Sequence, residues 1–444
     1  MATRTIHRHP LIAAVAGACA LLLGLAGCAS PVLSEDTGPP LAADGYTGPP
    51  VTIQYWNGFT GGDGPYMRAM VDEFNAAHEN IKVESNTLGW SDFYQRIVAA
   101  VHAGQGPDVA VMQLDNLATQ AARSVIVPME DAITQMGFTP ADFPETLVEA
   151  TTFDGHAWGV PLDSHTIASY ANTDQLAAAG VQAQASTGPA FESDLAAVQQ
   201  SGVVQPFWMP NKWPAHLMFL SLLWQGGGEP YSADGLTATY NSPAGVAALT
   251  WMVDQVKNKM SPTNVAIDSQ YLAFKNAEST VTWDGIWQIN DLKATAPKLN
   301  WSLAPIPTVF KTPASWANSH QFVMLAQRSP DPDEQQASKT FVKWMVEHSS
   351  QWAAAGMIPA YGPARNSAEF TSMPQSALAD QINNFHYLPS IPGIGDVNTQ
   401  TLELAVSEAL LGRLTPQQAL DQQAARADDI LASNAEKFGP TDQG

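Results

Sequence analysis

The sequence has very few cysteines. Of its 444 residues only Cys19 and Cys28 carry a thiol, and both lie near the N-terminus. Cys19 falls inside a predicted secretory signal and Cys28 at its end, as described below, so the remainder of the chain has no thiol. This scarcity excludes disulfides, thiolate zinc sites and cysteine nucleophiles from the body of the protein.

Basic residues are also scarce. The chain has 20 Lys and Arg against 42 Asp and Glu, which gives a formal net charge of −22 at pH 7. Without Arg4 and Arg8, which belong to the predicted signal, 18 basic residues face 42 acidic ones, a net charge near −24. Such a charge repels nucleic acid, so we expect no nucleic-acid partner. A Walker-type Gly-Lys-Ser/Thr loop is missing too, which excludes a phosphate-loop ATPase.

Long apolar runs are limited to residues 11–25. This run follows a basic stub and is too short to span a bilayer comfortably, so it predicts a secretory signal over residues 1–27. The run ends in Leu-Ala-Gly-Cys at residues 25–28, which resembles the bacterial lipobox and implies that Cys28 is lipidated. The alternative is an ordinary signal peptide with an incidental cysteine.

A low-complexity segment follows the proposed anchor. Residues 28–49 are rich in Pro, Gly, Ser and Asp and show no apolar period, which predicts a flexible tether. No later segment is long and apolar enough to cross a membrane. We therefore expect an extracytoplasmic lipoprotein on the outer face of the plasma membrane.

The body of the chain alternates between strand and helix patterns. Strands are expected at 51–56, 81–84, 108–112, 158–162, 167–171, 280–283 and 322–326. Helices are expected at 66–78, from the N-cap Ser91 to Gly104, and at 191–200, 214–225, 243–258, 285–292, 334–347, 407–411 and 416–435. This alternation predicts an α/β fold with a mostly parallel sheet. The part of the chain between the predicted tether and the tail has about 390 residues, which is too many for one ordinary core and suits two lobes.

Several segments together resemble one protein family. They are residues 51–56 with the following helix, 103–109, 154–161, 168–176, 281–287, 337–345 and 356–359. In this order, behind a lipobox, they resemble the family 1 extracellular solute-binding proteins of ABC importers, which include maltose- and oligosaccharide-binding proteins. The resemblance implies a type II periplasmic-binding-protein-like fold, in which two α/β lobes hold the ligand in the cleft between them.

The same resemblance implies domain boundaries. Three hinge crossings are expected near His165, Trp316 and Ala360. Lobe 1 would comprise residues 50–165 with 317–359. Lobe 2 would comprise 166–316 with 360–437, and 438–444 would form a tail.

The first candidate ligand-binding residues follow predicted strands, where the loops of an α/β sheet supply contacts. Trp56, Asn57 and Phe59 come after the first strand, and an Asn side chain both donates and accepts hydrogen bonds. The two aromatic residues could instead close the core. Gln113 and Asp115 follow the third strand, and a carboxylate can accept from two sugar hydroxyls. Asp115 could alternatively cap the next helix.

Further candidates lie at strand ends and crossings. Asp163 and His165 lie on the first crossing, although a lone His is usually structural. Trp283, Asp284 and Trp287 lie at a strand end and the following helical turn. The resemblance implies that an aromatic residue near the position of Trp287 stacks on a sugar, and the alternative is a core Trp.

The remaining candidates are spread over the second half of the chain. Trp208 and the candidates Trp213, His216 and Trp224 cluster before a triple glycine, and we expect one or two of them to face the cleft. Ser319 and His320 lie at the second crossing, and Tyr361 and Arg365 follow the third. Arg365 could bind an anionic group through both guanidinium nitrogens, or pair with a surface acid.

These observations predict a lipid-anchored binding subunit of an ABC importer. It would capture a sugar or short oligosaccharide and deliver it to the permease, as a monomer without cofactor, metal or catalysis. One alternative ligand is a glycerophosphodiester or phosphorylated polyol, for which Arg365 is the obvious cationic group. A secreted carbohydrate-active hydrolase would need a carboxylate pair such as Asp163 and Asp284, which no motif marks. A signalling lipoprotein is a third alternative.

Overall fold

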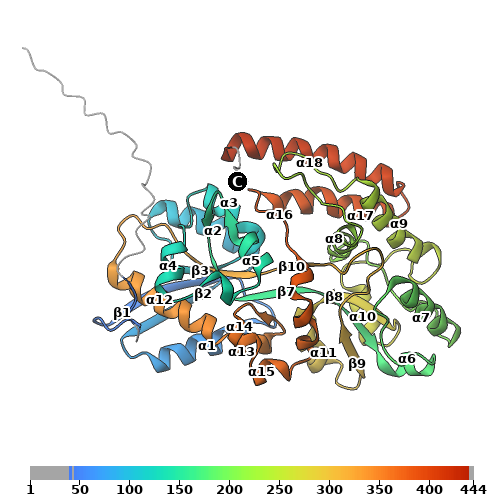
Figure 1. The fold of residues 1–444 in the computed structure, drawn as a ribbon, viewed down its shortest axis with the longest axis horizontal. Helices are drawn as coiled ribbons and strands as arrows, with labels where there is room; N and C mark the ends of the chain where they lie inside the picture. The colour runs from blue at the N-terminus through green and yellow to red at the C-terminus, as the bar shows by residue number, and fades with distance from the viewer. Residues whose placement is uncertain (1–39, 43–44, 440–444) are drawn as a thin grey trace, which may run out of the picture. The chain divides into compact units, whose positions relative to one another are not determined.

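The computed structural model describes residues 40–42 and 45–439 (Figure 1). The predicted signal peptide, the predicted lipidation site Cys28 and most of the predicted tether lie outside these residues. Among the described residues, no helix is both long and apolar enough to cross a membrane.

The first sheet has five strands in the order β2-β1-β3-β11-β6. Its strands are β1 (Val51–Asn57), β2 (Ile81–Thr87), β3 (Val109–Gln113), β6 (Val160–Pro161) and β11 (His320–Met324). β1 runs parallel to β2 and β3, whereas β11 runs antiparallel to both β3 and β6. Helices α1 (Gly64–Ala77), α2 (Trp90–Ala103) and α12 (Pro332–Glu347) belong to the same lobe. We call this part lobe 1.

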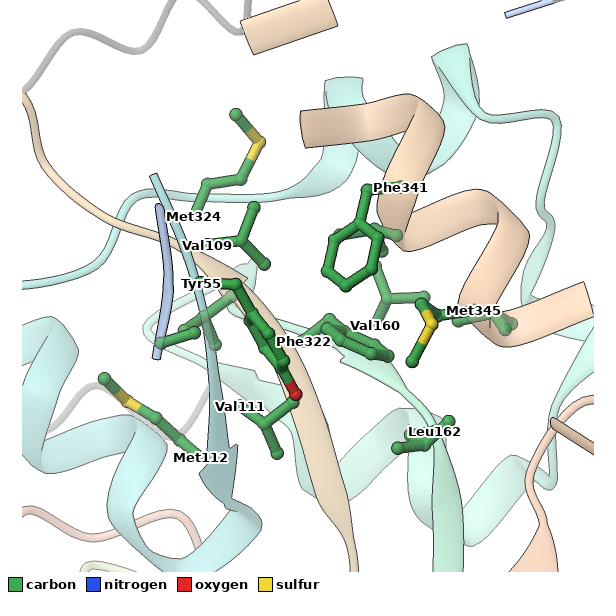
Figure 2. Packing of buried hydrophobic residues seen from close by; sticks show 14 of the residues in the cluster. Tyr55, Val109, Val111, Met112, Val160, Leu162, Phe322, Met324, Phe341 and Met345 are labelled. Atoms are coloured by element: carbon green, nitrogen blue, oxygen red, sulfur yellow. The ribbon is translucent and has the colours of Figure 1, made fainter. Parts of the chain in front are cut away.

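Alternating side chains of the first sheet build the core of lobe 1. Tyr55 of β1 and Phe322 of β11 are fully buried, and Phe341 of α12 lies against both rings. The ring centroids of Tyr55 and Phe341 are 5.2 Å apart, in an edge-to-face arrangement that aromatic pairs favour. Figure 2 shows these rings together with Val109, Val160 and Met345.

The second sheet is built around one long strand, β7 (Asp163–Asn172), in which all ten residues are buried. Its antiparallel neighbours are β8 (Val281–Gly285), β9 (Trp301–Ala304), β10 (Ser315–Asn318) and β12 (Ile358–Pro359), and β13 (Phe385–His386) pairs with β10 in parallel. This sheet and its helices form lobe 2.

Four helices cover the core of lobe 2. They are α8 (Ala215–Gln225), α9 (Pro243–Lys257), α17 (Glu403–Leu410) and α18 (Pro416–Phe438). Helix α17 contacts α8 and α9, and α18 lies along α17 and α9 (Figure 1). All eleven residues of α8 are buried, so this helix forms the centre of the lobe.

Shorter elements complete the two lobes. They are α3 (Leu117–Ala122), α4 (Glu130–Gln135), α5 (Glu145–Thr151), β4 (Thr152–Phe153), β5 (His156–Ala157), α6 (Thr173–Ala178), α7 (Gly188–Gln200), α10 (Ser269–Lys275), α11 (Ile289–Thr295), α13 (Ser349–Trp352), α14 (Gly362–Arg365), α15 (Ala368–Thr371) and α16 (Ile394–Val397).

The predicted alternation of strands and helices is confirmed, but three details are wrong. The sheets are mixed rather than mostly parallel, because β11 and β7 each enter a sheet after the chain has passed over from the other lobe. Ser91 is not an N-cap: α2 begins at Trp90, with Gly89 in the capping position. The residues Asp163, Ser164 and His165, expected to separate two strands, belong to β7.

The chain crosses between the lobes at three places. Leu162 joins β6 to β7, and Ser319 joins β10 to β11. The third passage lies between Trp352, in the core of lobe 1, and β12, which pairs with β7. That the three crossings act as hinges stays a prediction.

Tyr46, which falls within the predicted tether, contacts lobe 1. Tyr46 is buried against the core of lobe 1, its backbone N–H donates to Thr340 Oγ1 at 2.9 Å, and its carbonyl accepts from Asn80 Nδ2 at 3.0 Å. The chain is therefore held to lobe 1 from Tyr46 onward, four residues before the predicted lobe boundary.

Candidate functional site

A cavity of about 410 Å³ lies between the two lobes. Its lining residues are Asp63, Trp90, Gln113, Asp115, His165, Trp213, His216, Leu217, Trp287, Trp316, Asn318, His320, Met357, Leu388, Gly395, Asn398 and Thr399. The ends of β3, β7, β10 and β11 all reach this cavity, because the chain changes sheets beside it. Strand ends that meet at a change of sheet are a usual place for a ligand site.

The cavity brings together seven of the seventeen residues predicted to bind ligand. They are Gln113, Asp115, His165, Trp213, His216, Trp287 and His320. Lobe 2 contributes His165, Trp213, His216 and Trp287, and lobe 1 contributes Gln113, Asp115 and His320. Residues more than 200 positions apart in the sequence thus face one space.

Three predicted residues at the end of β1 and in the loop after it point into lobe 1 instead. Phe59 is buried, and its ring centroid lies 4.7 Å from that of Trp352. Asn57 is the last residue of β1 and its side chain is already bonded, since its Nδ2 donates to Ser85 of β2 and its Oδ1 accepts from the Phe59 N–H. Trp56 packs on the core from its edge. Trp56 and Phe59 therefore pack on the core of lobe 1, which was the alternative to a ligand-binding role.

Three predicted residues of lobe 2 are also inside it. Trp283 is fully buried and stacks on Trp251, with ring centroids 5.5 Å apart and planes 11° apart. Asp284 accepts hydrogen bonds from Gln270 Nε2 and the Gly285 N–H, and burial raises its pKa to about 6. Trp224 donates its indole N–H to Glu229. None of these three residues lines the cavity.

The last four candidates support the crossings. Arg365 donates to the backbone carbonyls of Pro359, the last residue of β12, and Ala360, so its guanidinium is bound within the chain rather than to a ligand. Tyr361 packs on Phe138 in lobe 1. Ser319 donates its hydroxyl to the Asp163 carbonyl.

Asp163 is buried directly behind the cavity. Its Oδ1 accepts from His165 Nδ1 at 3.2 Å, and its Oδ2 accepts from His320 Nδ1 at 2.7 Å and Trp352 Nε1 at 2.6 Å. Burial alone would raise the pKa of Asp163, but the two imidazoles hold it well below its usual range. This carboxylate fixes both imidazole rings from the side away from the cavity.

Four tryptophans form the apolar walls. Trp213 and Trp287 lie 6.2 Å apart between ring centroids, Trp316 stands at 89° to Trp287, and Trp90 stacks on His320. Trp213 is 38% exposed, which is high for a residue of this size. Exposed indole faces on the walls of a cavity can cover the apolar face of a flat ligand.

Polar groups lie between these walls. Asp115 accepts from Asn116 Nδ2 at 3.1 Å, and burial raises its pKa. Asn398 accepts from the Tyr231 hydroxyl, which leaves its amide N–H groups as donors. His216 has an unbonded Nδ1, and burial lowers its pKa to about 4, so its ring is neutral. Among the described residues that line the cavity, none is Lys or Arg.

Sequence reasoning missed ten lining residues. Asn318 ends β10 just before the second crossing, and Trp90 opens α2 after β2, so strand-end reasoning could have found both. Asn398 and Thr399 lie in a π-helical turn, Asn398–Leu402, for which the sequence gives no pattern. Such turns occur often at functional sites.

Residues 69–379 match the bacterial extracellular solute-binding proteins. The chain belongs to this family. The resemblance predicted from the sequence is thus confirmed, and so is the two-lobe α/β fold. This is a family of binding proteins, which confirms that the chain is not an enzyme.

The solute-binding protein has several sugar-binding relatives. It is 21% identical over 358 residues to the maltotriose-binding protein of Pyrococcus abyssi, which covers 78% of this chain and 74% of that one. It is 25% identical over 228 residues to the diacetylchitobiose binding protein DasA of Streptomyces coelicolor, 51% of each chain. The structure of the sugar-binding protein MalE from Xanthomonas citri superposes with a TM-score of 0.78 at 19% identity, covering 87% of this chain and 99% of that one.

Proposed function

We propose that this solute-binding protein is the lipid-anchored capture subunit of an ABC importer and that its ligand is a neutral sugar or short oligosaccharide. It would be anchored through Cys28, act as a monomer and pass its ligand to the permease. The observation that carries the ligand class is the lining of the cavity, which combines tryptophan faces with neutral or acidic hydrogen-bonding groups and no Lys or Arg among its described residues.

Each type of lining group matches one part of a sugar. The apolar face of a pyranose packs well on an indole, which Trp213, Trp287 and Trp316 supply. Hydroxyl groups donate to carboxylate, amide and imidazole acceptors such as Asp115, and they accept from amide donors such as Asn398. A volume of about 410 Å³ lies within the range of ordinary small-molecule sites.

The alternative ligands are less well supported. A phosphodiester needs cationic partners, but Arg365 is bound to two backbone carbonyls and does not line the cavity. The hydrolase alternative needs two carboxylates facing one bond. Asp163 is bonded to two histidines behind the cavity, whereas Asp284 lies inside lobe 2, so these residues do not form such a pair.

A ligand screen by thermal unfolding tests this proposal. The full chain in detergent would be heated with maltotriose, diacetylchitobiose, monosaccharides or glycerophosphocholine, and hits confirmed by calorimetry. A ligand at 100 times its Kd stabilises the folded state by about 2.7 kcal/mol, so a sugar should raise the unfolding midpoint. A shift with glycerophosphocholine alone would contradict the neutral-sugar proposal. The anchor is tested separately by Cys28→Ser, which should release the protein from the membrane.

A further inference from the structure

We propose that His165 and His320 recognise two hydroxyl groups of one sugar residue as hydrogen-bond donors, and that the buried Asp163 holds both rings in the tautomer that this recognition needs. The inference rests on the proposed function and deepens it, because it limits the ligand to sugars in which these two hydroxyls are unsubstituted. Asp163 itself would not touch the sugar. It is a positioning residue behind the two imidazoles.

The first argument is the carboxylate that the two imidazoles share. His165 Nδ1 lies 3.2 Å from Asp163 Oδ1, and His320 Nδ1 lies 2.7 Å from Asp163 Oδ2. Burial opposes ionisation of Asp163, but the two imidazoles hold its pKa well below the usual range, so the carboxylate is charged. A charged carboxylate only accepts hydrogen bonds, so each Nδ1 carries the proton. In a neutral imidazole the lone pair then lies on Nε2.

The second argument is the direction in which the rings face. His165 and His320 both line the cavity, whereas Asp163 does not. In the described part of the chain, the hydrogen bonds of both side chains run through Nδ1, toward Asp163. Each histidine is only 5% exposed, so the edge that carries Nε2 is the part that can meet a molecule in the cavity. The ring centroids are 4.6 Å apart, close enough for one sugar residue to contact both.

The third argument is that aromatic neighbours hold both rings in place. Trp90 stacks on His320, with ring centroids 5.8 Å apart and planes 12° apart. Trp287 and Trp316 meet the His165 ring edge-on, at centroid distances of 6.0 and 6.2 Å. This packing fixes which edge of each imidazole faces Asp163 and which faces the cavity. A sugar that lies on Trp287 or Trp316 therefore meets two fixed acceptors.

Two fixed acceptors restrict the ligand by its chemistry. A free hydroxyl group donates a hydrogen bond, whereas an ether, an ester, a phosphate ester or a fluorine at the same carbon does not. A ligand without the donor leaves a buried lone pair unpaired, which costs more than the bond itself contributes. The two histidines would thus select a sugar residue that is unsubstituted at both positions.

The ¹⁵N NMR spectrum of the full chain, labelled in its histidines and free of sugar, tests the tautomers. At pH 8 we expect both rings to be neutral, with the proton on Nδ1 and the lone pair on Nε2. The variants His165→Gln and His320→Gln assign the signals. A proton on Nε2 of either ring at this pH would overturn the inference.

Calorimetry with maltotriose, and with derivatives that carry fluorine in place of one hydroxyl each, tests the recognition. In the wild type, fluorine at two positions of one glucose unit should each weaken binding about 10- to 100-fold, because an imidazole loses its donor. Asp163→Asn offers one acceptor and one N–H donor, so one ring must move its proton to Nε2. At the position that faces this ring, the effect of fluorine should fall to about threefold or less.

The matched control is Glu130→Gln. Glu130 accepts from His156 Nδ1 at 2.9 Å, in an exposed carboxylate–histidine pair outside the cavity, so its loss should leave the fluorine pattern unchanged. A wild type that tolerates fluorine everywhere would overturn the inference. So would Asp163→Asn if it weakened maltotriose and every derivative equally, as a merely structural residue would. If Asp163→Asn does not fold, the wild-type tautomers and fluorine pattern still decide. If no sugar in the screen binds, the proposed function fails, whereas the tautomers show separately whether the two rings present acceptors.

Discussion

Trp283 and Trp287 are only four residues apart but lie in different surroundings. Trp283 ends inside lobe 2 against Phe207 and Trp251, whereas Trp287 is partly exposed at the cavity. Strand β8 ends at Gly285 between them, where an added Cβ would lie 2.1 Å from the Trp287 ring. The absence of a side chain at Gly285 therefore lets the Trp287 indole fold back over the backbone.

This contrast gives a paired prediction. Trp287→Ala should weaken sugar binding by about 10- to 1000-fold, because losing a stacked aromatic anchor costs on the order of 2–4 kcal/mol. Trp283→Ala should instead lower the free energy of unfolding by about 3–5 kcal/mol, since it empties a core position. Calorimetry with the sugar found in the screen measures the first effect, and denaturant unfolding measures the second. Unchanged affinity in folded Trp287→Ala would remove Trp287 from the site.

His216 predicts a pH dependence of stability. Burial lowers its pKa to about 4, whereas the unfolded chain takes up a proton near pH 6.5. Between these values the unfolded state binds more protons, so stability falls as the pH falls from about 6.5 to about 4. The free energy of unfolding that is lost between pH 7.5 and 4.5 should be roughly 2–3 kcal/mol smaller in His216→Gln than in the wild type. Urea unfolding at the two pH values checks this, and equal losses would show that His216 is protonated in the folded protein.

At the scale of elements, Asp163 joins three parts of the chain. Its carboxylate bonds to His320 of β11 and to Trp352 of α13. One side chain at the first crossing is therefore bonded to β11, which follows the second crossing, and to α13, which precedes the third. A buried carboxylate that satisfies several donors contributes most through what its loss leaves unpaired.

Asp163→Ala therefore predicts a large loss of stability. Two imidazole N–H groups, the indole N–H of Trp352 and the backbone N–H of His320 would lose their acceptor. We expect the free energy of unfolding to fall by at least about 3 kcal/mol, measured by chemical denaturation. Asp163→Asn keeps one acceptor oxygen and should cost less. A loss below about 1 kcal/mol in Asp163→Ala would contradict this role.

The sequence predicted the positions of helices and strands better than it predicted how the strands pair and which side chains are exposed. Periodicity located β1, α1 and α9 closely because one face of each is buried in a regular pattern. It could not show that β11 pairs antiparallel with β3, because that pairing depends on where the chain changes lobes. It also could not separate Trp283 from Trp287, since both are apolar residues near one strand end and only the turn at Gly285 decides which is exposed.

At the scale of the molecule, the family and the two-lobe fold followed from segments spread along the whole chain, whereas the site did not. Five of the seven predicted residues that reach the cavity lie at or just beyond strand ends, whereas Trp213 and His216 reach it from the start of α8. Asn398 and Thr399 reach it from a π-helical turn near the C-terminus, which no local pattern relates to β3 or β7. Assigning such residues requires the packing of α17 and α18 on lobe 2.

The central strand of lobe 2 also constrains the order in which the protein forms. β7 ends at Asn172, but its partners β8, β10 and β12 begin at Val281, Ser315 and Ile358. A chain that emerges N-terminus first during export therefore exposes ten residues that belong in a core while nearly 190 more have yet to appear. Contacts between such distant segments form slowly, and an unpaired strand edge is open to aggregation until its partners arrive. For this protein the risk of aggregation is greatest before β12 has emerged, and during that interval a chaperone would need to cover β7.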